Sequence, residues 1–127
     1  PEVKRGIFPF QVMATLEPLM SARQLLDLCI RAKTLSAEEA KEIGIVSEVV
    51  DAENLENRVQ ELIAEIKEQS PTAIRLGLKA YHEMKTKNAD EKHKYLHAML
   101  MQCLQSKDAE EGLLAFKEKR KPNWIGN

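Results

Sequence analysis

The amino-acid sequence predicts a mainly α-helical chain. Ala, Leu, Glu, Lys and Arg, which favour helices, make up 63 of the 127 residues, whereas Gly and Pro contribute five each. Apolar residues recur every three or four positions along most of the chain, which is the spacing of a buried helix face. We therefore expect about five to six helices with one short strand near residues 45–50, and we do not expect a β-sandwich.

The first part of the chain predicts an extended entry followed by two helices. Residues 1–10 mix Pro and Gly with apolar side chains, which favours a turn. From Gln11 to about Ala32 the apolar residues are dense, and Pro18, which lacks an amide hydrogen, divides a short helix from a longer one. The longer helix carries one apolar face, so we expect that face to pack against a partner surface.

A capping box marks the start of the next helix. The Ser36 hydroxyl can accept a hydrogen bond from the Glu39 amide, while the Glu39 carboxylate accepts one from the Ser36 amide. The helix is short, because Gly44 offers the left-handed conformation that ends helices. The segment 45–50, Ile-Val-Ser-Glu-Val-Val, is rich in β-branched residues and predicts the single strand.

Helical spacing returns after Asp51 and continues to the tail. It predicts helices over residues 55–69, 71–85, 90 to about 104, and 108–121. The last of these begins acidic and ends basic, which suits the helix dipole at both ends, and Pro122 stops it. We expect these helices to form one domain or sub-domain, because the sequence shows no repeat and no low-complexity linker.

Composition and charge exclude several classes of protein. A net charge of −1 lacks the positive excess of nucleic-acid binders, and no apolar run approaches the roughly 20 residues that span a bilayer. We therefore expect neither a nucleic-acid nor a membrane partner. Cys29 and Cys103 lie far apart in helical patterns, which indicates reduced thiols and hence the cytoplasm or a reducing organelle.

Individual residues give few catalytic signals. His93 and His97 are four apart on one helix face, which suits a metal ion, but no third ligand is found, so we expect a solvated face and no metal site. The basic residues 117–121 beside Phe116 could bind a phosphate group, although a helix end that satisfies its own dipole is the simpler interpretation. Glu2, which precedes a turn, could present its carboxylate to a cleft.

Blocks of sequence at the start, middle and end of the chain resemble one known family. They are PEVKRGIFP (1–9), LSAEEAKEIGIVSEVV (35–50), SKDAEEG (106–112) and AFKEKRKPNW (115–124). In this order and spacing they closely resemble the second half of the enoyl-CoA hydratase/isomerase (crotonase) family. The resemblance implies the C-terminal helical part of a spiral α/β fold. Residues 1–127 would form a single segment, with 1–50 at the end of the spiral core and 51–127 as a helical trimerisation region.

The resemblance also implies an activity on acyl-CoA thioesters. An enoyl-CoA hydratase would add water across the Cα=Cβ bond of a trans-2-enoyl-CoA, as in β-oxidation of fatty acids, with the enolate held by two backbone amides. A Δ3,Δ2-enoyl-CoA isomerase is the alternative, because residues 10–13 are Phe-Gln-Val-Met and not the Gly-rich stretch of many hydratases. A non-catalytic helical module that self-associates is the alternative of another class.

Three site residues follow from the resemblance. Glu2 falls on the family's Pro-Glu motif and would be the catalytic acid/base, if burial raises its pKa. Phe116 and Lys119 match tail positions that contact the adenine-nucleotide end of coenzyme A, which is part of the substrate and the only cofactor implied. The full-length parent would be a homo-oligomer, a trimer or hexamer. The oxyanion amides lie upstream of Pro1 in the family, so we expect a fragment that is inactive alone.

Overall fold

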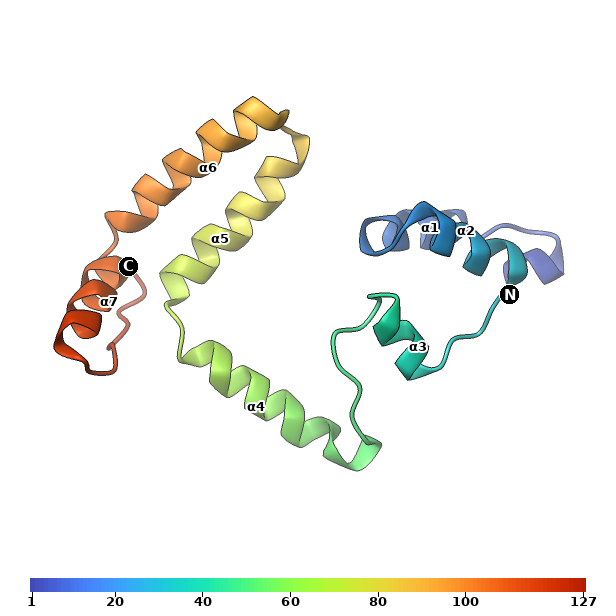
Figure 1. Cartoon of the computed structure of the whole chain (residues 1–127), viewed down its shortest axis with the longest axis horizontal. Coiled ribbons are helices and arrows are strands. Elements are labelled where there is room, and N and C mark those ends of the chain that lie inside the picture. The colour runs from blue at the N-terminus through green and yellow to red at the C-terminus, as the bar shows by residue number, and fades with distance from the viewer. The chain divides into compact units, whose positions relative to one another are not determined.

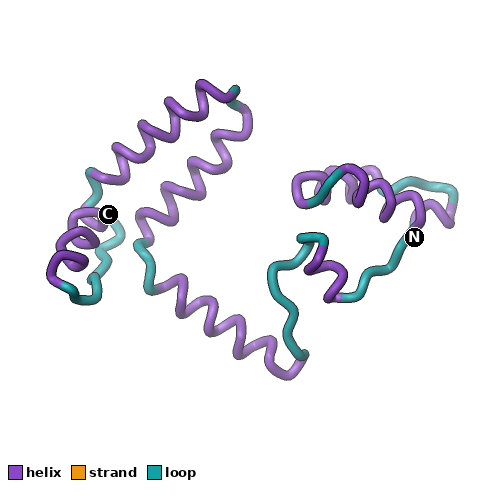
Figure 2. Tube along the Cα trace, viewed as in Figure 1, coloured by secondary structure: helices purple, strands orange, loops and turns teal.

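The structure, a computed structural model, describes residues 1–127 and contains helices only (Figures 1 and 2). Seven α-helices and four short 3-10 helices follow one another along the chain. They form two compact units, Pro1–Leu55 and Glu56–Asn127. The prediction of a mainly helical chain is confirmed, although the helices are more numerous than the five to six expected.

The first unit is built around the helix pair α1 and α2. Its elements are η1 (Glu2–Arg5), α1 (Phe10–Leu16), η2 (Glu17–Leu19), α2 (Ala22–Arg31), α3 (Ala37–Glu42) and η3 (Ala52–Asn54). Pro18 lies inside η2, so the helices divide where the sequence predicts. The α2 helix packs against α1 and η1, and its buried residues are Leu25 and Cys29.

Capping boxes start three of the helices. The pairs are Ser21 with Gln24 before α2, Ser36 with Glu39 before α3, and Asn88 with Glu91 before α6 (Ala89–Leu104). In the predicted box, Ser36 Oγ accepts from the Glu39 amide at 3.1 Å and Glu39 Oε2 accepts from the Ser36 amide at 2.8 Å. This prediction is confirmed, because both hydrogen bonds are local and need no other part of the fold.

The strand predicted over residues 45–50 is wrong. After the left-handed Gly44 (φ 86°), the amides of Ile45 and Val46 donate to the Ala40 carbonyl and close the end of α3. No strand is present anywhere in the chain, so the β-branched run has no neighbour with which to form a ladder. A strand needs that neighbour, and the preference of individual side chains does not replace it.

The second unit contains a helical hairpin, with one helix before it and another at its open end. Its elements are α4 (Leu55–Lys67), α5 (Pro71–Glu83), η4 (Met84–Thr86), α6 (Ala89–Leu104) and α7 (Lys107–Glu118). The helices α5 and α6 pack together, and α7 contacts both (Figure 1). Leu76, Ala80 and Met99 form a buried cluster, against which Tyr95 and Cys103 are partly buried.

Much apolar surface stays exposed in both units. Six hydrophobic residues are buried, whereas 22 large hydrophobic residues are exposed. The α4 helix shows this clearly, because its apolar residues Leu55, Val59, Ile63 and Ile66 are all exposed. Apolar surface of this extent is typical of regions that other protein covers. No helix has both the length and the apolar content that crossing a membrane would require.

Candidate functional site

Glu2 lies beside a mostly apolar cavity of the first unit. The cavity has a volume of about 310 Å³ and is lined from η1, α1, α2 and the segments that flank α3. Glu2 and Lys33 are the only charged side chains that line it, and Leu16 and Leu28 are among its apolar walls. A carboxylate beside apolar space can move a proton on an apolar substrate, so the cavity is the first candidate site.

A tight turn holds Glu2 at the cavity. The Ile7 amide donates to the Glu2 carbonyl at 3.2 Å, and Gly6 ends η1 in the left-handed conformation at φ 76°. A Cβ at Gly6 would touch nothing, so the backbone conformation and not the available space favours glycine here. The turn packs against α2, which fixes Glu2 relative to the cavity walls.

The Glu2 carboxyl is ionised more readily than an ordinary glutamate. Its side chain is 34% exposed, and its Oε2 lies 2.9 Å from the amino-terminal nitrogen of Pro1. The hydrogen bond from Pro1, the largest cause, and one from the Glu2 amide lower the pKa below the ordinary 4.5, against the opposing effect of burial. In a chain that continues before Pro1, the proline nitrogen carries neither charge nor hydrogen, so the largest cause of the lowered pKa is absent. The raised pKa expected of an acid/base stays a prediction.

The second candidate site, Phe116 and Lys119, lies at the end of α7. The helix ends at Glu118 and does not continue to residue 121 as expected. Lys119 is left-handed (φ 56°), and the amides of Lys119 and Arg120 donate back to the carbonyls of Phe116 and Ala115. This is a Schellman ending, in which glycine usually takes the position of Lys119. Phe116 is 86% exposed, so both predicted residues face solvent at one helix end.

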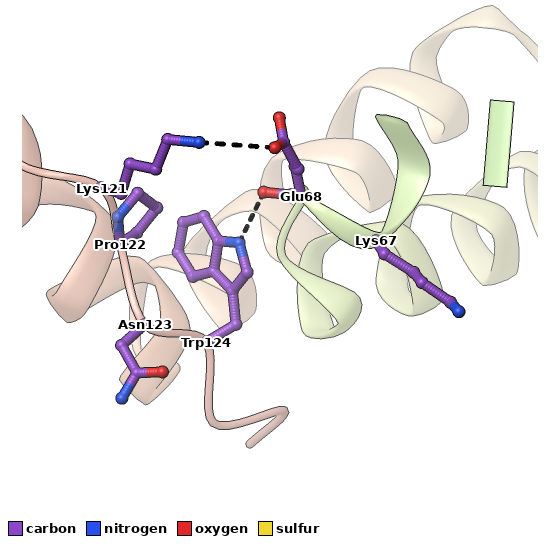
Figure 3. A pocket seen from close by; sticks show the side chains of 6 residues that line it. All are labelled: Lys67, Glu68, Lys121, Pro122, Asn123 and Trp124. Atoms are coloured by element: carbon purple, nitrogen blue, oxygen red, sulfur yellow. Dashed lines mark hydrogen bonds and ion pairs between the residues drawn. The ribbon is translucent and has the colours of Figure 1, made fainter. Parts of the chain in front are cut away.

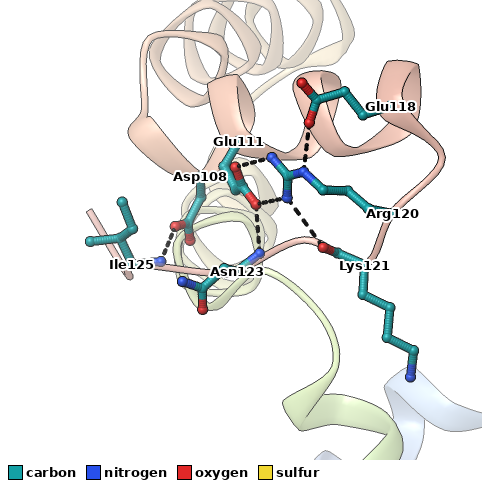
Figure 4. Close-up of polar contacts among 7 residues, drawn as sticks. All are labelled: Asp108, Glu111, Glu118, Arg120, Lys121, Asn123 and Ile125. Carbon is teal, nitrogen blue, oxygen red and sulfur yellow. Dashed lines mark hydrogen bonds and ion pairs between the residues drawn. The ribbon is translucent and has the colours of Figure 1, made fainter.

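The basic cluster divides into paired and unpaired cations. Arg120 binds both carboxylate oxygens of Glu111, at 2.6 and 2.9 Å, and its Nε donates to Glu118 at 2.7 Å (Figure 4). Hydrogen bonds from Arg120 and from the Asn123 amide lower the pKa of Glu111 from 4.5 to about 2. Arg120 therefore serves the fold, whereas Lys119 forms no ion pair and is free to bind an anion.

Asp108 is the buried carboxylate that connects this region. Asp108 is 1% exposed. Its Oδ2 accepts hydrogen bonds from Ser70 Oγ at 2.8 Å and from the Thr72 amide at 3.3 Å. Its Oδ1 accepts from the amides of Ile125 and Gly126 at 2.8 and 2.9 Å. Burial alone would raise its pKa, but these bonds, led by those from Gly126 and Ile125, hold it well below the ordinary range. From its place in the sequence alone, Asp108 is only an acid that suits the start of a helix.

Trp124 fastens the tail to the end of α4. Its Nε1 donates to the Glu68 carbonyl at 2.8 Å, and Lys121 Nζ lies 3.5 Å from the Glu68 carboxylate (Figure 3). These residues line a cavity of about 400 Å³, where Lys67 points away from the Lys121 pair. A Cβ on Gly112 would lie 3.2 Å from the indole, so glycine permits this close approach. The charged residues Glu68 and Lys121 of this cavity are paired with each other across the contact between the tail and the end of α4.

The other reactive side chains form no site. His93 and His97 are exposed, and no group of three His, Cys, Asp or Glu side chains could hold a metal ion. Cys29 and Cys103 are both free, the first buried and the second partly buried. The two candidates are therefore the Glu2 cavity and the α7 end.

The comparison with known protein families covers the full length of this sequence. A family model described as enoyl-CoA hydratase/isomerase matches residues 1–127. The chain belongs to this family. The resemblance seen in the sequence is thus confirmed, and the helical architecture matches the helical part of the solved structures of enoyl-CoA hydratase/isomerase proteins.

Relatives within the enoyl-CoA hydratase/isomerase family carry different names. The chain is 35% identical over 104 residues to methylmalonyl-CoA decarboxylase of Escherichia coli K12, covering 80% of this chain and 40% of that protein. It is 30% identical over 131 residues to carnitinyl-CoA dehydratase of the same strain, covering 99% and 50%. An enoyl-CoA hydratase structure from Mycobacterium tuberculosis H37Rv matches with a TM-score of 0.88 at 26% identity, covering 100% and 51%. The chain thus spans about half the length of these proteins.

Acylation of Pro1 is expected to raise the pKa of Glu2. An acylated proline nitrogen has neither charge nor hydrogen, so the largest cause of the lowered pKa is removed. We would titrate the Glu2 side-chain carbon by ¹³C NMR in chains with free and acetylated Pro1. Arg5→Ala, which removes a weaker attraction, should raise the pKa less. Identical titrations with free and acetylated Pro1 would contradict this account.

The second unit is expected to lose stability as the pH falls from about 4.5 toward 2. The pKa of Glu111 is lowered in the fold, so the unfolded chain binds more protons; the stabilisation is complete above 4.5 and is lost on acidification. Glu111→Gln should lower stability at pH 7 and make this pH dependence shallower, as measured by urea unfolding. Glu110→Gln, at an exposed neighbour, is the matched control. Parallel curves for Glu111→Gln and the unchanged chain would refute the assignment.

Proposed function

We propose that the chain is the C-terminal part of an acyl-CoA-processing enzyme, an enoyl-CoA hydratase, with Glu2 as its catalytic acid/base. The observation that carries the proposal is the Glu2 carboxylate on the wall of an apolar cavity of about 310 Å³. Family membership supports an acyl-CoA thioester as the substrate. The coenzyme A of that substrate is the only cofactor that the proposal needs.

In this proposal each candidate residue has one task. Glu2 in its ionised form takes a proton from the water whose oxygen bonds to Cβ, and the resulting carboxylic acid protonates the enolate at Cα, which completes the addition of water. Phe116 offers an exposed aromatic face to the adenine, and Lys119 offers an unpaired cation to a phosphate. The donors that hold the enolate oxygen, and a second hydratase glutamate, belong to a part of the protein outside residues 1–127.

A Δ3,Δ2-enoyl-CoA isomerase is the second candidate. Glu2 is the only carboxylate that lines the cavity, and a single carboxylate can move a proton between two carbons without activating water. The names of the relatives include a decarboxylase and a dehydratase, so this family supports several reactions on acyl-CoA. Self-association is supported separately by the exposed apolar surface, which a homo-oligomeric parent would cover.

Glu2→Gln in the full-length protein is expected to lower turnover of an enoyl-CoA by about 10²–10⁴-fold. The amide keeps the size of the side chain but cannot accept and return a proton at neutral pH. Hydration and double-bond migration would be followed separately on trans-2- and 3-enoyl-CoA, which distinguishes the two candidates. Glu42→Gln, at an exposed position outside the cavity lining, is the control. Unchanged turnover would remove Glu2 from the mechanism.

Lys119→Gly is expected to stabilise the fold while weakening coenzyme A binding. The left-handed conformation at position 119 costs a residue with a Cβ about 1–2 kcal/mol, and glycine adopts it without this strain. The same substitution removes the cation of the lysine side chain. Lys119→Ala should weaken binding without this gain in stability, and in both variants the loss should be largest at low salt.

Calorimetric titration of the full-length protein with coenzyme A at several ionic strengths measures the binding, and thermal unfolding measures the stability. Lys117→Ala, which removes a cation from the last turn of the same helix, is the matched control. If the Lys119 variants bind coenzyme A with unaltered affinity at every ionic strength, Lys119 has no part in binding and is only a cation at the helix end.

A further inference from the structure

The residues that line the Glu2 cavity differ in burial. Pro9 and Cys29 are buried, Leu16 and Leu28 are partly buried, and Lys33 is exposed. The buried pair therefore lies at the inner end of the cavity, and the exposed side chain lies at its mouth. An apolar chain that enters beside Glu2 would end against the buried pair.

Of the two inner residues, only Cys29 has a side chain whose size can vary without changing the backbone. Pro9 is fixed by its ring, and its carbonyl accepts the Met13 amide at 2.8 Å at the start of α1. Cys29 is 7% exposed, free of any disulfide and placed inside the regular helix α2. Cys29 is therefore the buried lining residue at which a substitution can change the size of the side chain.

We propose that Cys29 determines the length of the acyl group that the cavity accepts, and that this group is short. The inference rests on the proposed function, because the acyl thioester is the occupant that it assumes. The apolar walls suit a hydrocarbon chain, and the carboxylate of Glu2 lies where the reacting carbons would be. A volume of about 310 Å³ is at the small end of ligand pockets, which span about 300–1,000 Å³.

The first test compares acyl-chain preference in the full-length protein. Cys29→Met adds two carbons to the side chain, so the kcat/KM ratio of an eight-carbon to a four-carbon enoyl-CoA should fall by at least the roughly 10–200-fold that one methylene causes in an apolar pocket. Cys29→Ala should shift the ratio in the opposite direction.

Two controls separate size from other effects. Cys29→Ser keeps the size of the side chain and should keep the ratio, and Ile30→Met, at an exposed position of the same helix outside the cavity lining, should not change it. A ratio that is the same in the Met, Ala and Ser variants would overturn the proposal.

The second test needs no catalysis and uses the 127-residue chain itself. Methyl methanethiosulfonate is a small neutral reagent that labels thiols, and Cys103, in the second unit, provides an internal reference. Butanoyl-CoA and hexanoyl-CoA should slow labelling of Cys29 at least fivefold relative to Cys103, whereas adenosine 3′,5′-bisphosphate, which has the nucleotide part of coenzyme A but no acyl group and no thiol to consume the reagent, should not.

The outcomes of the two tests are distinguishable. Absence of turnover in the full-length protein together with acyl protection of Cys29 would remove the proposed reaction and keep the cavity as an acyl site. Labelling of Cys29 that no acyl-CoA slows would overturn the proposal even in an active enzyme. If Cys29→Met does not fold, Cys29→Ala and the labelling experiment still decide.

Discussion

The second unit depends most on the hydrogen bonds that the buried carboxylate of Asp108 accepts. A buried charge is costly unless donors satisfy it, and here four donors do so, from the start of α5 and from the tail. Asp108 itself lies in the first turn of α7, so three segments distant in sequence meet at one side chain. The position of the α7 end, with Phe116 and Lys119, follows from this anchor together with the Glu111 pair to Arg120.

Asp108 and Glu2 show how environment separates two carboxylates of similar chemistry. Asp108 is enclosed and its oxygens are occupied, so it is fixed in its ionised form and can contribute only to structure. Glu2 is 34% exposed beside an open cavity, where its oxygens can change hydrogen-bond partners. A carboxylate that can exchange its partner is suited to proton transfer, whereas one that holds four donors is not.

The sequence predicts the features that depend on neighbouring residues. The capping box at Ser36, the break at Pro18 and the helical content all follow from short-range rules, and each is present. The strand over residues 45–50 fails because pairing depends on a distant segment. The structural role of Asp108 is not predicted for the same reason, because its donors lie 36 to 38 residues before it and 17 to 18 residues after it.

The site residues follow the same rule: the sequence predicts what depends on neighbouring residues and does not predict what depends on distant segments. The position of Glu2 beside an apolar cavity depends on packing between η1 and α2, which no local pattern encodes, and its place before a turn was a weaker signal for it than the family resemblance. The exposed end of α7 was foreseeable from its basic residues, but the left-handed Lys119 and the pairing of Arg120 were not. The pairing of Arg120 depends on Glu111, nine residues before it in the sequence.

The docking of Trp124 has an optical consequence. It is the only tryptophan of the chain, and its indole is partly buried, bonded to the Glu68 carbonyl and set against Gly112. Detachment of the tail would move this ring from a partly buried position into water. Intrinsic fluorescence of the unlabelled chain therefore reports the attachment of one nine-residue segment, residues 119–127, separately from the helical content seen by circular dichroism.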